Sequence, residues 1–463
     1  MDELDLVVVG AGPGGYVAAI RAAQLGLRTA VVEQERAGGV CGNWGCIPSK
    51  AILADAELYR AVRDGAGHGI VTDGLRPDFP RVMARSREVA AQQARGVESL
   101  FRKHRIRLVQ GRGILVEGGV QVVRDGAPSE LLRAAHVLLA TGSRERTLPG
   151  LEVDGSVVQT SREALADTRL PASLVVVGGG AVGVEFAYAY ASFGAKVTVV
   201  EMAGTLLPEM DVDLGRELQR AFGKQGIDVL VGHRFEQLER AGDAARITVS
   251  GAAEPRAVQA ERVLVAVGRS PLSDDLGLEA LGVRTQRGFV VVDPGMQTSV
   301  PGIFAIGDLV GPLLLAHTAS EQGVIAAETI AGRRAGTPPF DVSRVPMCVY
   351  CQPEVAAVGL TEAKARERGD VKVGKVPFRA LGKAMATGHG EGFVKLVAGA
   401  RHGEVLGVHM IGHGVTDLIA EAGLARSLEA TTHELRDTVH AHPTLAEALR
   451  EAALAAEGEA INI

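Results

Sequence analysis

Two cysteines lie five residues apart near the start of the chain, at Cys41 and Cys46. Such a pair can form and break a disulfide by exchange with another thiol. Five residues along a straight helix rise about 7.5 Å, whereas the Cα atoms of a disulfide lie roughly 4.4 to 6.8 Å apart. The pair can therefore bridge only where the backbone bends, and Gly42 and Gly45 permit a bend. We predict a redox-active disulfide, with a structural disulfide or two buried thiols as the alternatives.

A lysine follows this pair at helical spacing. If the chain continues as a helix past Pro48, Cys46 and Lys50 share a face because they are four residues apart. One sulfur and one ammonium would then point at the same group, and a flavin ring fits that place. The chain has four cysteines and we expect no secretory segment, which favours the redox interpretation. The other two, Cys348 and Cys351, would point to opposite faces of an extended segment, so we expect a structural role.

The elements that must position these residues come from an internal repeat. Residues 4–33 and 174–201 both read as a strand, a glycine-rich turn, an apolar helix and a second strand that ends in Glu33 or Glu201. In both copies the glutamate lies 23 positions after the first glycine. The turn glycines of the two copies are Gly10, Gly12 and Gly15, and Gly178, Gly180 and Gly183.

This pattern is typical of a dinucleotide site. The glycines allow a tight turn and let a pyrophosphate approach the helix N-terminus, while the acid reaches a ribose hydroxyl. For either copy alone, a turn without a ligand is the alternative. Apolar runs at residues 137–143 and 263–269 follow the two copies and end in glycine, as buried parallel strands beside a ligand do.

Charge and hydropathy exclude other classes of protein. The formal net charge is −6 and the sequence pI is about 6.1, without a basic arm that would indicate nucleic-acid binding. The longest apolar stretch, residues 174–193, contains Glu185 and several glycines, so we expect no membrane span. No basic segment precedes the first strand, which favours a cytoplasmic location.

The cysteine pair, the two glycine-rich turns and the segment 301–308 (PGIFAIGD) together resemble the flavin disulfide reductases over essentially the whole chain. The tail at residues 440–447 is most similar to the dihydrolipoamide dehydrogenases. The resemblance implies an α/β fold with two Rossmann-like dinucleotide-binding domains, for FAD and NAD, and a C-terminal α+β dimerisation domain. We expect an FAD-binding domain at 1–147, an NAD-binding domain at 148–269, a central domain at 270–342 and an interface domain at 343–463. Within the first domain, residues 51–104 should form a helical excursion.

The resemblance also implies an FAD site. Lys50 would lie near the flavin, and Glu185, in the first turn of the second copy's helix, would pair with it; an ordinary helix N-terminal acid is the alternative for Glu185. A helix that begins over 314–317 would direct the positive end of its dipole at the flavin. The implied FAD residues are Gly10, Gly12, Gly15, Glu33, Lys50, Gly113, Thr141, Gly142, Ser143, Asp308, Leu314, Leu315, Ala316 and His317.

The second copy would bind NAD through Gly178, Gly180, Gly183, Glu201 and Gly268. Glu201 favours NAD over NADP because a carboxylate repels a 2′-phosphate, and no arginine lies within residues 202–207. This separates the chain from the glutathione reductases. Mercuric reductases are disfavoured because they need a second cysteine pair near the C-terminus.

His442 and Glu447 match the acid–base pair of the family. Histidine titrates near neutrality, and a carboxylate on its other nitrogen fixes the tautomer. In the family this segment completes the site of the neighbouring subunit, which implies a homodimer with shared active sites. We expect His440 to pack or to give a supporting hydrogen bond; a second base or a metal ligand are the alternatives, but two histidines at this spacing make a poor zinc site. No metal is expected.

The implied reaction is the oxidation of dihydrolipoamide. Its thiolate would attack Cys41, Cys46 would remain as a thiolate against FAD, and hydride would pass to NAD. Partners would be the lipoyl domain of a 2-oxo-acid dehydrogenase complex or the glycine-cleavage H protein. The alternatives are an NADH-dependent reductase of another small disulfide and a catalytically silent flavoprotein. Trp44, between the two cysteines, would line the substrate channel or pack.

Overall fold

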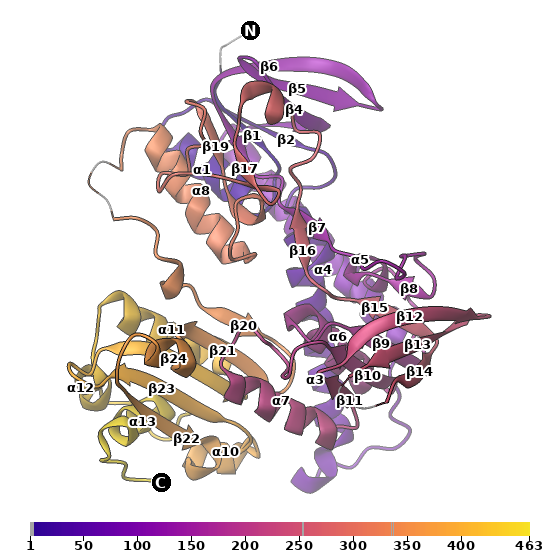
Figure 1. Cartoon of the computed structure of the whole chain (residues 1–463), viewed down its shortest axis with the longest axis vertical. Helices are drawn as coiled ribbons and strands as arrows, with labels where there is room; N and C mark the ends of the chain where they lie inside the picture. Colours follow the sequence, from indigo (N-terminus) through magenta and orange to yellow (C-terminus); the bar gives the residue numbers. More distant parts are fainter. Residues whose placement is uncertain (1–3, 252–253, 335, 337) are drawn as a thin grey trace. The chain divides into compact units, whose positions relative to one another are not determined.

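A computed structural model describes residues 4–251, 254–334, 336 and 338–463 of the chain (Figure 1). These residues form two compact units. Unit 1 comprises Met1–Ile52, Pro80–Arg146 and Gly268–Phe340. Unit 2 comprises Leu53–Phe79, Thr147–Val267 and Asp341–Ile463. Each unit is described by itself.

Unit 1 is built on a seven-stranded sheet with the order β3-β2-β1-β6-β5-β4, with β19 also paired with β6. Its strands are β1 (Leu4–Val9), β2 (Thr29–Glu33), β3 (Arg107–Gln110), β4 (Arg112–Val116), β5 (Gly119–Arg124), β6 (Ala127–Leu139) and β19 (Ile303–Ala305). The strands β3, β2, β1, β6 and β19 run parallel. Helices α1 (Pro13–Gln24), α4 (Phe79–Lys103) and α8 (Ala316–Ile330) pack on one face of the sheet, and β4, β5 and residues 276–290 pack on the other. Two short strands, β7 (Ser143–Glu145) and β16 (Arg269–Pro271), pair antiparallel.

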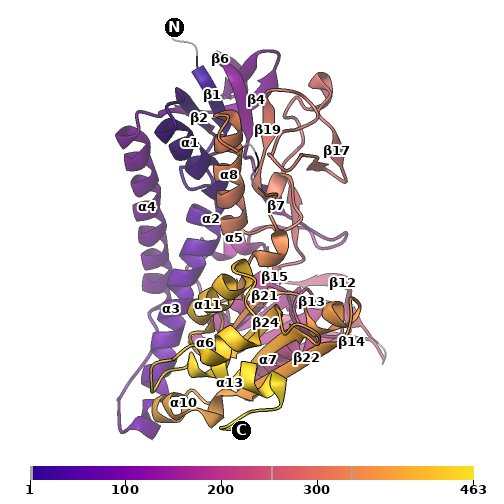
Figure 2. The same cartoon turned by 90° about the vertical axis from the view of Figure 1, so that its left-hand side faces the viewer.

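The helices of unit 1 follow the glycine-rich turn and the cysteine pair. They are α1 (Pro13–Gln24), α2 (Gly39–Trp44), the start of α3 (Cys46–Arg63), α4 (Phe79–Lys103) and α8 (Ala316–Ile330). Helices α1 and α8 lie side by side (Figure 2). They approach closely because Gly323 has no side chain: a Cβ there would press on the Gly14 carbonyl oxygen. This packing places the N-terminus of α8 relative to the first turn.

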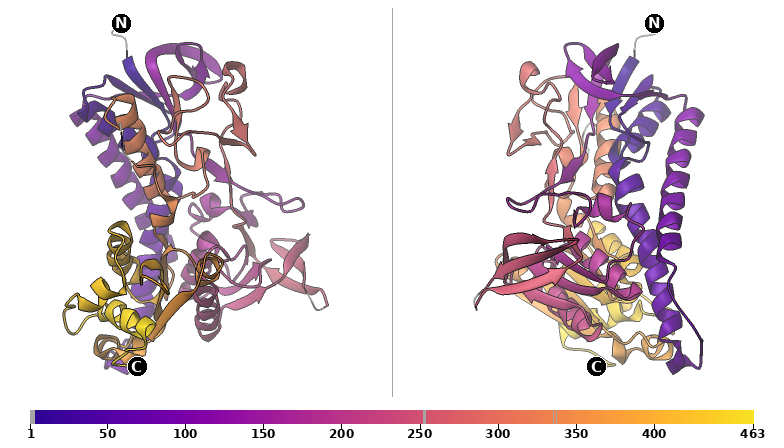
Figure 3. Two further views of the ribbon diagram at one scale, coloured as in Figure 1. Left: turned by 60° about the vertical axis from the view of Figure 1, so that its left-hand side comes forward. Right: turned by 90° about the vertical axis from the view of Figure 1, so that its right-hand side faces the viewer.

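Unit 2 contains a second sheet with the order β11-β10-β9-β15-β8, in which every pair is parallel. Its strands are β8 (Val158–Gln159), β9 (Ser173–Val177), β10 (Lys196–Glu201), β11 (Asp228–Val231) and β15 (Arg262–Val265). The helices of this part are α5 (Ser161–Ala164), α6 (Ala181–Phe193) and α7 (Val212–Lys224). A separate antiparallel sheet, visible in Figure 3, consists of β12 (Arg234–Ala241), β13 (Ala244–Ser250) and β14 (Arg256–Ala260).

The C-terminal part of unit 2 is an antiparallel sheet covered by helices. The strand order is β20-β21-β24-β23-β22, with bounds β20 (Met347–Val349), β21 (Glu354–Gly359), β22 (Val371–Pro377), β23 (Phe393–Gly399) and β24 (Val405–Gly412). The helices are α9 (Glu362–Arg366), α10 (Gly382–Thr387), α11 (Val415–Ser427), α12 (Thr432–Asp437) and α13 (Glu447–Glu457). Strand β23 is buried along its whole length, because it lies inside the sheet with helices against it.

The predicted fold class is confirmed. The two repeated copies form β1–α1–β2 and β9–α6–β10, and the last part is α+β. Residues 51–104 are largely helical, as predicted, in α3 and α4. The bounds of the four predicted domains stay predictions. Among the described residues, no helix is long and apolar enough to cross a membrane.

Candidate active site

Cys41 and Cys46 lie on two helices that meet at a single residue. Helix α2 ends at Trp44, Gly45 adopts φ −148° and ψ −114°, and α3 begins at Cys46. The predicted bend is therefore confirmed at Gly45. Of the two glycines that permit a bend, the structure uses Gly45, because Gly42 lies inside the regular turn of α2.

The bend brings the two cysteine side chains together as a dithiol. Hydrogen bonding with Cys46, followed by burial, raises the pKa of the Cys41 thiol above its usual range, while the Lys50 ammonium acts in the opposite direction. Helix α3 continues past Pro48, as predicted, so Lys50 lies one turn after Cys46. Pro48 is tolerated because its missing N–H lies in the first helical turn.

Trp44 and Asn43 hold α2 in place. The Trp44 indole N–H donates to Glu35 at 3.2 Å, and the Arg87 guanidinium stacks 4.2 Å from the centre of the indole ring. The amide of the buried Asn43 donates to the carbonyls of Ala37 and Gly39. Trp44 therefore packs within unit 1. Asn43 gave no signal in the sequence because its partners are backbone atoms.

Glu33 ties the first glycine-rich turn to the end of β2. Its carboxylate accepts from the Ala11 N–H at 2.7 Å and from the Glu35 N–H at 2.8 Å. Burial raises the pKa of Glu33, which is only 7% exposed. A Cβ at Gly10 or Gly15 would collide with backbone carbonyl oxygens of unit 1, so these glycines are required by the turn itself.

Glu201 repeats this arrangement in the second copy. It accepts from the Gly179 N–H at 2.6 Å and from the Ala203 N–H at 2.7 Å. A Cβ at Gly178 would overlap the Ala266 carbonyl oxygen, and one at Gly183 would overlap the Gly178 carbonyl oxygen. The repeated sequence pattern thus corresponds to a repeated hydrogen-bond pattern. Glu201 differs from Glu33 in being partly exposed.

The middle glycine of each turn faces open space. A Cβ at Gly12 or at Gly180 would meet no heavy atom within 4 Å. Both residues are the N-caps of their helices, α1 and α6, without a side-chain cap. The first helical N–H groups therefore remain available to an acceptor on each open side. Two dinucleotide pyrophosphates fit these two places.

Asp308 is part of a hydrogen-bonded group that links three segments of unit 1. The Ser143 hydroxyl donates to Asp308 at 2.5 Å, and Arg269 Nε donates to that hydroxyl at 2.7 Å. Arg269 also forms an ion pair with Glu145 at 3.0 Å. Burial raises the pKa of Asp308, against the effects of Ser143 and Arg269. Ser143 and Asp308 were predicted site residues, whereas Arg269 was missed.

The other predicted FAD residues lie in unit 1 as follows. Helix α8 begins at Ala316 with Leu315 as its N-cap, which confirms a helix start within 314–317. The Gly307 N–H donates to the buried side chain of Gln322 on α8 at 2.7 Å, a contact that the sequence did not reveal. Thr141 donates to the Leu272 carbonyl at 2.8 Å. A Cβ at Gly113 would press on Val9, whereas Gly142 has positive φ and faces open space. Gly268, which was predicted for NAD, lies in unit 1 and also has positive φ with open space around it.

His442 and Glu447 form the predicted pair. His442 Nδ1 lies 3.0 Å from a Glu447 oxygen, and the Thr444 N–H donates to the other oxygen at 2.9 Å. Burial alone would raise the pKa of Glu447, but these two partners lower it. The His442 side chain is 75% exposed, so its second nitrogen faces outward. His440 is nearly buried and lies 2.8 Å from Glu421, which confirms a supporting hydrogen bond.

Glu185 was predicted to lie in the first turn of its helix, and that is wrong. Helix α6 begins at Ala181, so Glu185 lies in the second turn. It is 6% exposed and accepts from the Tyr350 N–H at 3.0 Å. Its pairing with Lys50 stays a prediction. Cys351 is buried and Cys348 packs beside the core of the C-terminal part.

Two family models match consecutive parts of the chain. The model of the pyridine nucleotide-disulphide oxidoreductases matches residues 4–323, and that of their dimerisation domain matches residues 345–453. The dihydrolipoyl dehydrogenase of Bacillus subtilis is 45% identical, with 99% of each chain covered. That of Chlorobaculum tepidum is 46% identical over 97% of this chain and 96% of its own.

Solved structures agree with this result. LpdA from Mycobacterium tuberculosis has a TM-score of 0.89 at 29% identity, covering 97% of this chain and 99% of its own. The HOCl-induced flavoprotein disulfide reductase RclA from Escherichia coli has a TM-score of 0.84 at 26% identity, with the same coverage. The predictions of an oxidoreductase with FAD and NAD as cofactors and of a homodimer are thereby confirmed. The chain belongs to the pyridine nucleotide-disulphide oxidoreductase family.

Proposed function

We propose that the chain oxidises dihydrolipoamide, carried on a lipoyl domain or on a glycine-cleavage H protein, and reduces NAD. The observation that supports this most is the contact between Cys41 and Cys46 across the break at Gly45. Two thiols that are already in contact can form a disulfide without a large movement of the two helices that carry them. The dihydrolipoyl dehydrogenases similar to this chain support the choice of substrate.

The residues of the chain carry out a thiol–disulfide exchange. His442, oriented by Glu447, accepts the proton of a substrate thiol. The resulting thiolate attacks the Cys41 sulfur of the oxidised pair, and Cys46 leaves as a thiolate. The second substrate thiol then breaks the mixed disulfide, so lipoamide is released and the pair holds two electrons. Lys50 stabilises negative charge on the pair. Bound FAD supplies the electron carrier between this dithiol and NAD.

The cofactors are assigned to the two glycine-rich turns. FAD would bind at Gly12 and Glu33, with Asp308 and the N-terminus of α8 along its length, since these residues surround the first glycine-rich turn of unit 1. NAD would bind at Gly180 and Glu201. Lys50 and Glu185 are proposed to act as a pair beside the flavin.

A direct test of the function uses the thiols themselves. The oxidised enzyme is mixed anaerobically with dihydrolipoamide, then alkylated and digested for mass measurement. Labelling should increase at Cys41 and Cys46 and stay constant at Cys348. If labelling at the pair does not respond to the dithiol, it is not the electron acceptor.

The two kinds of turn glycine should respond differently to alanine. Gly183→Ala should lower the free energy of unfolding by about 1–3 kcal/mol, because the methyl group overlaps the Gly178 carbonyl. Gly180→Ala should change it by less than about 1 kcal/mol, since the site is open and only the helix cap is affected. It should instead weaken NADH binding about tenfold, the scale of a steric clash in a packed site. Denaturant unfolding and NADH fluorescence titration measure the two effects; equal NADH binding by Gly180→Ala would place the nucleotide elsewhere.

Coenzyme choice should depend on the residue after Glu201. Met202 is 71% exposed, so Met202→Arg adds a cation beside the carboxylate without disturbing the core. The ratio of kcat/KM for NADP over NAD should rise about tenfold, the value of one charge-assisted hydrogen bond. Met385→Arg, at a position that is 66% exposed, is the control for added charge. A wild-type enzyme already faster with NADP would contradict the assignment of Glu201.

The homodimer is proposed to share its active sites. The exposed His442 points its free ring nitrogen away from its own Glu447, as a residue that serves a partner would. Leu424 on α11 and its C-cap residue Leu428 are 61% and 72% exposed, and Val439, next to His440, is 94% exposed. The His440–Glu421 contact links α11 to the segment that carries the acid–base pair. A second copy that covers these apolar side chains would also cover His442.

Reduction of another small disulfide by NADH is the second candidate. It is favoured by the likeness to RclA, a flavoprotein disulfide reductase. The ratio of kcat/KM for dihydrolipoamide over other dithiols decides between the two.

A further inference from the structure

A buried lysine joins the nucleotide-binding sheet of unit 2 to its C-terminal sheet. Lys395, in β23, is 3% exposed. Its ammonium lies 2.9 Å from Asp211, 3.1 Å from Asp213 and 2.7 Å from Glu362. Asp211 and Asp213 are at the start of α7, in the nucleotide-binding part, whereas Lys395 and Glu362 belong to the C-terminal part. One ammonium therefore links the two parts.

The cluster is fully paired and charged. Asp213 also binds Lys375 at 3.0 Å, and Glu362 also binds Arg366 at 2.7 Å. Despite burial, the three carboxylate partners raise the pKa of Lys395. Lys395 in turn helps to lower the pKa values of Asp211, Asp213 and Glu362. Removing the ammonium would leave the 2% exposed Asp211 carboxylate without its cation, an expensive loss inside a protein.

Asp211 ends a loop that rests on the second glycine-rich turn. Its carboxylate caps α7 by accepting from the Asp213 N–H at 3.1 Å. Earlier in the loop, the Leu207 N–H donates to the Gly179 carbonyl at 3.0 Å. A Cβ on Gly179 would lie 2.7 Å from Leu206, which is fully buried. The loop 206–211 thus covers the turn between Gly178 and Gly180 and is fixed at its far end by Lys395.

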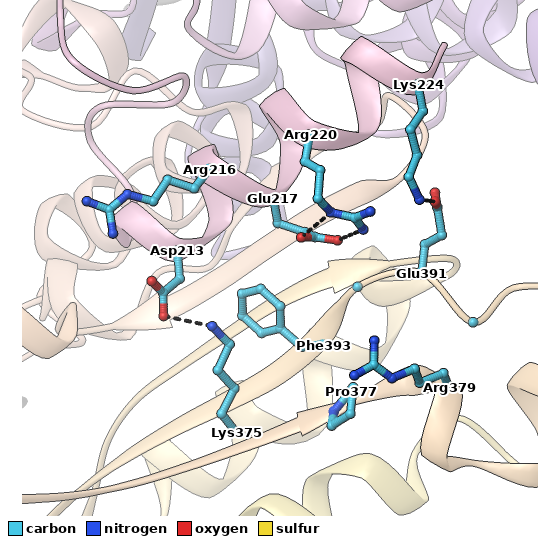
Figure 4. Close-up of a pocket in the computed structure, with 12 residues that line it drawn as sticks. Asp213, Arg216, Glu217, Arg220, Lys224, Lys375, Pro377, Arg379, Glu391 and Phe393 are labelled. Atoms are coloured by element: carbon cyan, nitrogen blue, oxygen red, sulfur yellow. Dashed lines mark hydrogen bonds and ion pairs between the residues drawn. The ribbon is translucent and has the colours of Figure 1, made fainter.

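Helix α7 is held against the C-terminal sheet mainly near its ends. Figure 4 shows the Asp213–Lys375 pair at one end and the Lys224–Glu391 pair, at 2.8 Å, at the other. Between them lies a cavity of about 740 Å³ with Phe393 on its wall. Helix α7 also contacts β24, and the buried cluster is the charged contact that fixes the start of the helix.

We propose that Lys395 is a positioning residue for the nicotinamide nucleotide. It anchors Asp211, and through the loop 206–211 it holds the Gly179 segment in the conformation that the pyrophosphate needs. The inference rests on the proposed binding of NAD at this turn. It assigns a function in the NAD half of the reaction to a residue of the dimerisation domain.

The test compares Lys395→Met with Lys224→Met, which removes the same charge from the exposed pair at the other end of α7. For Lys395→Met, the Kd for NADH and the KM for NAD should rise about tenfold, within the range of coupling through a packed network. The kcat at saturating NAD, the KM for dihydrolipoamide and the FAD content should stay within about twofold. Lys224→Met should match the wild type. Lys395→Arg, which keeps the charge, should recover most of the affinity.

Asp211→Asn provides the second variant if Lys395→Met does not fold. Asparagine is as good a helix cap as aspartate, so the cap of α7 is kept, whereas the charge and the acceptor for the Glu362 N–H are lost. The KM for NAD should again rise alone. If either variant folds with an unchanged Kd for NADH, or if both substrate KM values rise together, Lys395 is only structural and the inference is overturned. A wild-type enzyme that does not bind NADH would instead contradict the proposed function.

Discussion

Turnover of dihydrolipoamide is expected to fall by about four orders of magnitude or more when Cys41 is replaced by serine, as happens when a nucleophilic residue is removed from other enzymes. A serine hydroxyl cannot form the mixed disulfide, so the two substrate electrons have no acceptor. Cys46 alone cannot complete the exchange, because the second substrate thiol needs a disulfide to break. Steady-state reduction of NAD by dihydrolipoamide is the measurement.

Cys41→Ser should keep the half of the reaction in which electrons pass between NADH and the flavin. Transfer of electrons from NADH to an artificial acceptor needs the cofactors but not the cysteine pair, so it should remain close to wild type in Cys41→Ser. Cys348→Ser is the matched control, because Cys348 packs beside the core of the C-terminal part and should tolerate the change. More than about 1% residual dihydrolipoamide turnover in Cys41→Ser would exceed the expected loss and argue against exchange at this pair.

His442→Gln is expected to lower dihydrolipoamide turnover by about two to four orders of magnitude, the usual contribution of general acid–base catalysis. Glutamine can still approach Glu447, so flavin content and dimer mass should not change. His440→Gln is the control, since His440 is nearly buried and bonded to Glu421. Its effect should fall mainly on stability.

Mixed dimers test whether His442 serves the partner subunit. When His442→Gln and Cys46→Ser subunits exchange, one of the two sites in the mixed dimer combines an intact cysteine pair with an intact His442–Glu447 pair. Activity should therefore return from two nearly inactive parents, up to about half of one wild-type dimer by simple counting of sites. If mass measurement shows mixed dimers but activity stays at the level of the parents, the base acts within its own chain.

The sequence predicted those features for which the local backbone conformation allows only one residue type. Gly10, Gly15, Gly178 and Gly183 are needed because a side chain would overlap a carbonyl oxygen a few residues away or on the neighbouring strand. The two glutamates followed from the same spacing. His442 and Glu447 are close in sequence, so their contact was also predictable.

Contacts between distant segments could not be predicted in this way. Arg269 reaches Ser143 across 126 positions, and Lys395 reaches Asp211 across 184. A lysine within an apolar strand gives no indication of which carboxylates neutralise it. One bend was predicted, at Gly42 or Gly45, because glycine permits a bend without requiring it. Only the helix bounds show that Gly42 continues a regular turn.

The two glycine-rich turns differ in what rests on them, and this bears on how long each ligand stays. The first turn is enclosed: Glu33 is buried, and Gly39, at the start of the helix that carries Cys41, lies directly against Gly12. The second turn is more open, with Glu201 partly exposed. An enclosed binding site slows dissociation and suits a cofactor that remains bound through many turnovers. A more open site suits a coenzyme that must leave after each hydride transfer. We therefore expect the FAD proposed for the first turn to stay bound longer than the NAD proposed for the second.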